Sequence, residues 1–197
     1  DSSAGEPFSL VASFVPPAGV QKYLGLSSEI KVTGAALPDW WMHGAGLCRG
    51  PTGLSASFDA PGTTCVDYWQ GRAVGGFLYQ AGYSGPNSAL LRVQAALPFE
   101  AASALDPARE YYAFTVRMQR PKASEACVGC DLPVALQLEH IKLFQPPEAR
   151  FDPLLTYPVD RNLAFWQQRL IMPTITEVSP LVGGAGTSVR IKGTNLA

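Results

Sequence analysis

The stretch that decides the fold runs from residue 110 to residue 146 and reads EYYAFTVRMQR, PKASEACVGCDL and PVALQLEHIKLFQP. In the first and third segments apolar and polar residues alternate, which is typical of β-strands with one buried face. The alternation in the third segment changes phase at Glu139 and His140, which predicts a β-bulge there. The two strands, joined by the cysteine-containing loop, are predicted to form the central hairpin of a β-sandwich.

Segments on the amino-terminal side continue this pattern. Alternating or aromatic-rich runs separated by turn residues occupy residues 7–15, 23–33, 53–59, 65–83 and 88–95. The chain contains 19 glycines and 17 prolines, which favour frequent turns over long helices. The chain is therefore predicted to be all-β, with residues 1–147 forming an antiparallel β-sandwich or jelly roll.

Composition argues against several functional classes. Charged residues make up 16% of the 197 residues, the formal net charge is −1, and no basic run occurs, so nucleic-acid binding is not expected. The apolar stretches are too short for a transmembrane helix, so membrane insertion is not expected. No G-x-S-x-G occurs, and no pattern fixes a metal site. We predict no catalytic residue, metal, cofactor or enzymatic activity.

The four cysteines, Cys48, Cys65, Cys127 and Cys130, allow two disulfides in three pairings. Cys48 and Cys65 enclose a loop rich in turn-forming residues, which suits a surface disulfide. Cys127 and Cys130 form a C-x-x-C, but no helical pattern follows it, as a redox motif would require. Two structural disulfides are the favoured interpretation, with a metal site, reduced thiols or redox chemistry as alternatives. Disulfides would indicate an exported protein.

Residues 148–172 follow two prolines and show no clean period. They carry too many large apolar residues for a free linker. We expect an extended arm that packs along the sandwich or against a partner. Phe165 and Trp166 would add buried contact to that interface.

The last segment, PTITEVSPLVGGAGTSVRIKGTNL (173–196), resembles the opening of an IPT/TIG domain, an immunoglobulin-like β-sandwich. The matching positions include Pro173, Ser179-Pro180, Gly186-Thr187, Gly193 and Asn195-Leu196. The resemblance implies that residues 173–197 form about two strands of a fold that needs about seven, and two strands cannot bury a core of their own. Either a whole domain follows Ala197, or the apolar residues of these strands pair with a neighbouring copy: Ile175, Val178, Val189 and Ile191.

Residues 10–150 also resemble a group of uncharacterised exported bacterial proteins. The shared features are SFVPPAGV, LPDWW, HGAG-x-CR, TGLSA-x-FD, C-x-D-x-W, EYYAF, C-x-GC-x-x-PV and I-x-LFQPPEA-x-FDP. The group has no assigned activity. The resemblance therefore implies secretion by a bacterium and no particular chemistry.

Aromatic residues gather on either side of the loop between the first two cysteines. If exposed on a β-sandwich, Trp40, Trp41, Tyr68 and Trp69 could stack on sugar rings, although core packing explains most aromatic residues.

We expect a secreted structural or assembly protein of the cell surface or extracellular matrix, joined to other copies or to surface proteins in a filament or lattice. The alternative is a polysaccharide-binding or adhesion module that uses the tryptophan loop.

Overall fold

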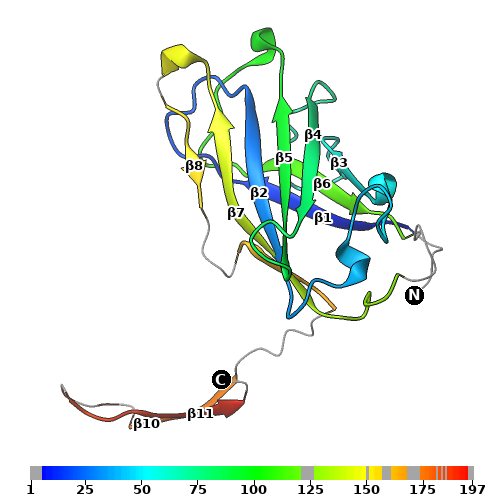
Figure 1. Cartoon of the computed structure of the whole chain (residues 1–197). Coiled ribbons are helices and arrows are strands. Elements are labelled where there is room, and N and C mark those ends of the chain that lie inside the picture. Colours follow the sequence, from blue (N-terminus) through cyan, green and yellow to red (C-terminus); the bar gives the residue numbers. More distant parts are fainter. Residues whose placement is uncertain are drawn as a thin grey trace. The chain divides into compact units, whose positions relative to one another are not determined.

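The protein is described by a computed structural model covering residues 6–120, 127–149, 151–156, 161–167, 174–180, 182, 184 and 186–194. The chain divides into two compact units, residues 1–167 and residues 168–197. Both are built from antiparallel β-strands (Figure 1), and the helices described are single 3-10 turns: η1 (Asp39–Trp41), η2 (Pro51–Gly53), η3 (Phe99–Ala101) and η4 (Pro147–Ala149). The fold is all-β, as the residue alternation predicts.

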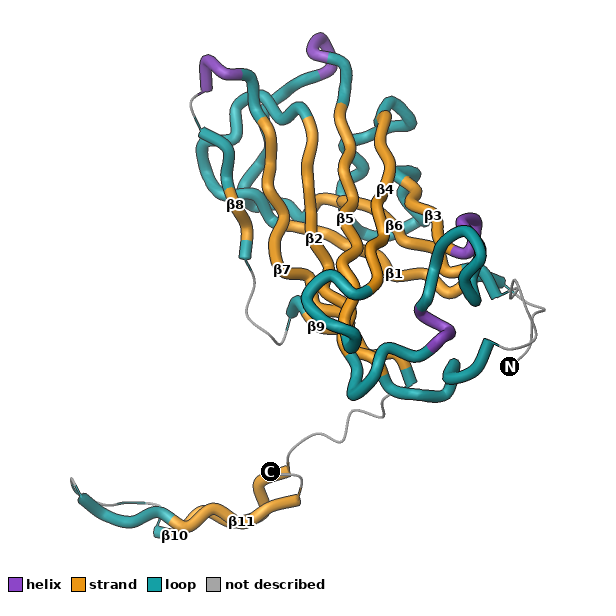
Figure 2. Tube along the Cα trace, viewed as in Figure 1, coloured by secondary structure: helices purple, strands orange, loops and turns teal. Residues whose placement is uncertain are grey.

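The first unit is a sandwich of two antiparallel sheets. The larger sheet has the order β4-β5-β2-β7-β8, with β9 also pairing with β7, and the smaller has the order β1-β6-β3. In Figures 1 and 2 the strands of the smaller sheet cross those of the larger one. The strands are β1 (Phe8–Phe14), β2 (Gly25–Thr33), β3 (Leu54–Ser57), β4 (Val74–Ala81), β5 (Ser88–Ala96), β6 (Tyr111–Met118), β7 (Val134–Phe144), β8 (Leu154–Leu155) and β9 (Leu163–Trp166).

The core lies between the two sheets. It receives alternate residues of β2 and β5 from one side and most of β6 from the other. Strand β6 is the central strand of the smaller sheet, and all of its residues except Arg117 are buried. The alternation predicted for β6 therefore understates its burial, because Ala113 and Thr115, on the side that the alternation assigns to solvent, are buried as well.

The prediction of a central hairpin formed by β6 and β7 is wrong. Strand β6 pairs with β1 and β3, whereas β7 pairs with β2, β8 and β9 in the other sheet. A hairpin needs a tight turn, and the connection between Met118 and Val134 is too long to impose one. The bulge in β7 is confirmed, because Glu29 opposes His140 while Ile30 opposes Leu138, which leaves Glu139 as the extra residue.

The arm following residue 147 belongs to the sandwich. Strands β8 and β9 both add to β7, and the first unit extends to residue 167. Trp166 is 8% exposed and packs against Phe8, Trp40 and Trp41, with ring centroids 4.6, 6.0 and 5.8 Å away. Trp166 is therefore a core residue of its own chain and not the interface residue predicted from the sequence. Phe165 is half-buried beside it.

The second unit contains an antiparallel hairpin of β10 (Thr174–Ser179) and β11 (Arg190–Thr194). The two strands fall where the sequence alternates. Every side chain described in this unit is exposed.

Two adjacent glycines in β4 provide a local test of the packing. A Cβ at Gly75 would overlap the carbonyl oxygen of Gln94 and lie 2.7 Å from Cε2 of Phe58, whereas a Cβ at Gly76 meets nothing within 4 Å. We expect Gly75→Ala to lower the free energy of unfolding by about 1–3 kcal/mol. The matched variant Gly76→Ala should be neutral or slightly stabilising. Urea unfolding curves measure both, and equal effects would contradict the close packing of Phe58 under β4.

Candidate functional site

The structure pairs the cysteines differently from the local pairing that the loop between Cys48 and Cys65 suggests. Cys48 bonds to Cys127, with a sequence separation of 79, while Cys65 and Cys130 are free thiols. Of the two disulfides expected from the sequence, the structure contains one. This bond ties the loop after η1 to the connection between β6 and β7. The described residues contain no group of three or more His, Cys, Asp or Glu side chains placed to hold a metal ion.

The predicted tryptophan loop is buried. Trp40, Trp41 and Trp69 are 4%, 2% and 0% exposed. Trp69 Nε1 donates a hydrogen bond of 2.8 Å to the carbonyl of Ala113, and Tyr68 is half-buried with its hydroxyl 2.6 Å from the backbone nitrogen of Ser103, from which it accepts. The prediction of a sugar-stacking surface formed by these tryptophans is wrong, because their rings fill the core.

His43 lies in the same loop under the edge of the larger sheet. Its ring contacts the ring of Tyr79, and the Tyr79 hydroxyl donates a hydrogen bond of 2.7 Å to the carbonyl of Trp41. Burial, and then the positive charge of Arg49, lower the pKa of His43 from 6.5 to about 3. The Arg49 guanidinium stacks 3.7 Å from the centroid of Trp40. The imidazole is therefore neutral at ordinary pH and helps to pack the loop.

The low pKa of His43 makes stability depend on pH. In the unfolded chain His43 takes up a proton below about pH 6.5, whereas in the folded chain it does so only below about pH 3. Between these values the unfolded state binds more protons, so acidification favours unfolding. Above pH 6.5 the free energy of unfolding is unaffected by this difference. Below pH 6.5 it falls by up to about 1.4 kcal/mol for each pH unit of acidification. We expect His43→Gln to flatten this part of the profile. Unfolding midpoints of both proteins between pH 7 and pH 4 test it, and parallel curves would contradict it.

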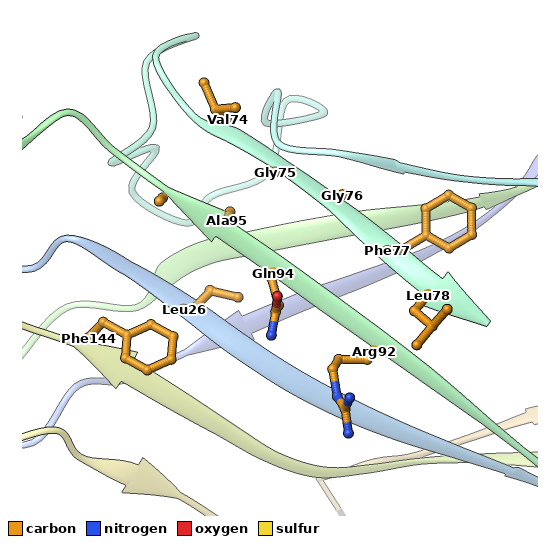
Figure 3. Close-up of a pocket in the computed structure, with 11 residues that line it drawn as sticks. Leu26, Val74, Gly75, Gly76, Phe77, Leu78, Arg92, Gln94, Ala95 and Phe144 are labelled. Carbon is orange, nitrogen blue, oxygen red and sulfur yellow. The ribbon is translucent and has the colours of Figure 1, made fainter. Parts of the chain in front are cut away.

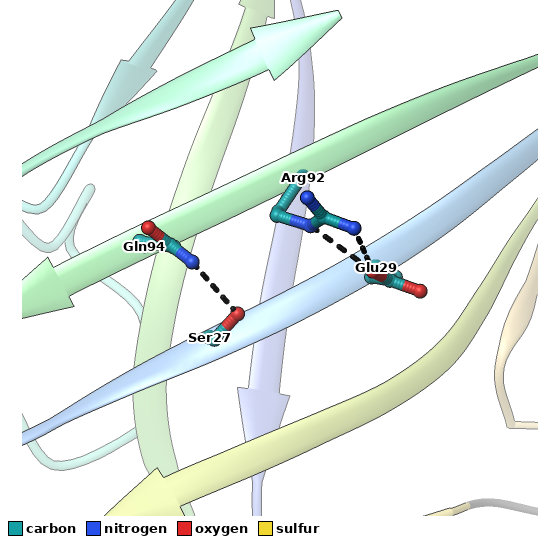
Figure 4. A network of polar contacts seen from close by, with 4 residues as sticks. All are labelled: Ser27, Glu29, Arg92 and Gln94. Atoms are coloured by element: carbon teal, nitrogen blue, oxygen red, sulfur yellow. Dashed lines mark hydrogen bonds and ion pairs between the residues drawn. The ribbon is translucent and has the colours of Figure 1, made fainter. Parts of the chain in front are cut away.

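An open groove lies across the end of the larger sheet, on the strands β4 and β5 (Figure 3). Its volume is about 720 Å³, and its lining includes Val74, Leu78, Gln94, Ala96 and Phe144. Neighbouring side chains form a polar ladder on the outer face (Figure 4): Arg92 is in a salt bridge with Glu29, and Gln94 donates a hydrogen bond of 3.3 Å to Ser27. These polar side chains pair with one another. The apolar side chains of the groove are therefore the part of its lining without a described partner.

Strand β4 is an exposed edge strand. In the part of the chain that the structure describes, it pairs only with β5, so one side of its backbone has no strand partner. Its sequence, VGGFLYQA, contains no charge and no proline, the devices by which edge strands usually avoid association. Val74 and Leu78 are 77% and 53% exposed. Its unpaired edge and exposed apolar side chains make this strand a candidate site for adding a further strand.

The side chain of Phe77 in β4 is only partly covered. Phe77 stands opposite Val93, on the face that leads into the core. Val93 is fully buried, yet Phe77 is 36% exposed. An aromatic side chain at the edge of the core is thus left partly in water.

The hairpin of the second unit has two different faces. Val178 opposes Ile191, and both are exposed, at 36% and 52%. Glu177 opposes Lys192 on the other face, with 2.7 Å between the Lys192 Nζ and a Glu177 carboxylate oxygen. Arg190 shares that charged face by alternation. The hairpin is therefore an amphipathic ribbon. The structure describes the backbone of Ile175 in β10 but not its side chain, so its part in the predicted interface stays a prediction.

Comparisons with known proteins add no assignment: no protein-family model matches the chain, and the searches of curated proteins and of solved structures found no match. None of the helices in the described residues is long and apolar enough to cross a membrane. The sequence alone did not single out β4 as a candidate site. The signal available was an uncharged, proline-free run with two adjacent glycines, within the segment 65–83.

Proposed function

We propose that this protein is a structural subunit of a bacterial cell surface or extracellular matrix, whose copies join through strand donation by the hairpin β10–β11. The observation that carries the proposal is the apolar face of that hairpin, which no further strand described in its own unit covers. Val178, Val189 and Ile191 are all exposed in the structure. A two-stranded ribbon gains stability by adding to another sheet that covers its apolar face.

Two features support an extracellular setting. The disulfide Cys48–Cys127 is of the kind that persists in oxidising compartments. The resemblance of residues 10–150 to exported bacterial proteins points the same way. The resemblance of residues 173–196 to an immunoglobulin-like domain supports a strand-forming role for the tail, since such strands are made to pair within a sandwich.

The native mass in solution tests the proposal. We expect the full chain to form species several times its monomer mass of 21.0 kDa in light scattering, increasing with concentration. A chain ending at residue 167 keeps every strand of the sandwich and should be monomeric. A full chain that stays monomeric, or a truncated chain that assembles equally well, would contradict strand donation.

A further inference from the structure

We propose that the acceptor for the donated hairpin is the free edge of β4 in a second copy of this chain, with β11 as the adjoining strand. This inference rests on the proposed strand donation and names its receiving site. When β11 pairs with β4 of the second copy, the apolar face of the hairpin covers Phe77. The charged face continues the outer surface of the larger sheet beside Val74 and Leu78.

Among the edge strands described, β4 has the most exposed apolar side chains, with Val74 and Leu78 at 77% and 53% against 42% for Val11 of β1. Strand β1 is also uncharged, and its residues 10–13 line a hollow together with residues 161–164 of the same chain. Strands β3, β8 and β9 have four, two and four residues. Strand β4 has eight residues, enough to pair with the whole of β11, which has five.

The two surfaces match in polarity. Phe77 alternates to the core side and is 36% exposed. Val74 and Leu78 lie on the outer side together with Arg92. The alternation of β11 supplies Ile191 for the core side and Arg190 and Lys192 for solvent. A strand with this alternation extends the sandwich without burying a charge.

Charge favours β11 over β10 as the adjoining strand. A second hollow, between the end of β3 and the start of β4, has Asp59 as the charged residue in its lining. Strand β11 brings Arg190 and Lys192 to this edge, whereas β10 would bring the carboxylate of Glu177. An acidic side chain attracts the basic strand and repels the acidic one.

The reach of the chain indicates a second copy as the donor. Strand β9 lies four strand positions from β4, so with β11 added at the edge and β10 beyond it, the hairpin's first strand would lie about 29 Å from β9. The chain from Trp166 to Thr174 spans about 28 Å even when fully extended. A hairpin added to its own sandwich would leave this stretch fully extended, with no slack to turn at either strand end, which favours a second copy as the donor. Because donor and acceptor are different surfaces, the contact is heterologous and propagates from copy to copy.

Charge substitutions in β4 test two points together: that β4 is the accepting strand, and that its outer side lies beside the charged side of β11. The double variant Val74→Lys, Leu78→Lys places two lysines beside Arg190 and Lys192, and we expect it to be monomeric at concentrations at least tenfold above those at which the unaltered chain assembles. The matched double variant Val74→Glu, Leu78→Glu should assemble at least as well as the unaltered chain. Both sites are highly exposed, so unfolding midpoints should be unchanged.

A mixing experiment completes the test. The lysine variant should assemble with a chain carrying Arg190→Glu and Lys192→Glu, as measured by light scattering of the mixture. If the lysine variant assembles normally while truncation at residue 167 abolishes assembly, strand donation holds and β4 is not the acceptor. If the lysine and glutamate variants are both monomeric, the pairing with β11 is wrong. If the unaltered chain is monomeric throughout, both proposals fail.

Discussion

Replacing Cys48 with serine is expected to lower the free energy of unfolding by about 4 kcal/mol. The bond to Cys127 closes a loop with a sequence separation of 79, and cross-linking a loop of this length restricts the unfolded chain by about that amount. It also ties the loop carrying Trp40 and Trp41 to the connection that crosses between the sheets. Denaturant unfolding, followed by tryptophan fluorescence, measures the loss.

The control for this prediction is Cys65→Ser, which changes a half-buried free thiol and should cost less than about 1 kcal/mol. Alkylation of the unreduced, denatured chain should label Cys65 and Cys130 and leave the other two cysteines unmodified. Labelling of Cys48, or an equal loss of stability in the two serine variants, would show that the cysteines are paired differently.

Replacing Trp69 with alanine is expected to cost about 3–5 kcal/mol. The side chain is fully buried between Tyr23 and Phe58, with ring centroids 5.5 and 5.9 Å away, and its loss also removes the donor to the Ala113 carbonyl. That carbonyl lies in the central strand of the smaller sheet, so it would be left in the core without this partner.

The effect of Trp69→Ala is measured by thermal or urea unfolding. Phe99→Ala is the comparison, because Phe99 is 60% exposed and its truncation should change stability by no more than about 0.5 kcal/mol. A small effect at Trp69, or a loss of sugar binding with no loss of stability, would instead favour an exposed tryptophan that serves as a ligand platform.

The sequence predicts strands far better than it predicts partners. Period-2 alternation located β1, β2, β5 and the bulge at Glu139, because side-chain direction is a local property of extended backbone. It could not assign β6 and β7 to different sheets, since the alternation says which face is buried and not which strand lies alongside. The partners are selected by long-range packing.

The same limit explains the errors at the candidate site. A tryptophan beside glycines has the same local pattern in a surface loop and in a core, and only the assembled sandwich buries Trp40 and Trp69. The cysteine pairing likewise depends on which loops meet in space. The amphipathic character of the β10–β11 ribbon was predictable, because it follows from the alternation of Val189 and Ile191 with Arg190 and Lys192.

Amide hydrogen exchange of the full chain at low and high concentration tests the central claim most directly. The account predicts that protection of residues 74–81 and of residues 190–194 rises together with concentration, because each strand supplies the other's missing hydrogen bonds. The amides of β2 should be equally protected at both concentrations, since this strand is paired on both sides within one copy. Unchanged, rapid exchange in both segments, at concentrations where light scattering detects assembly, would contradict strand donation to β4.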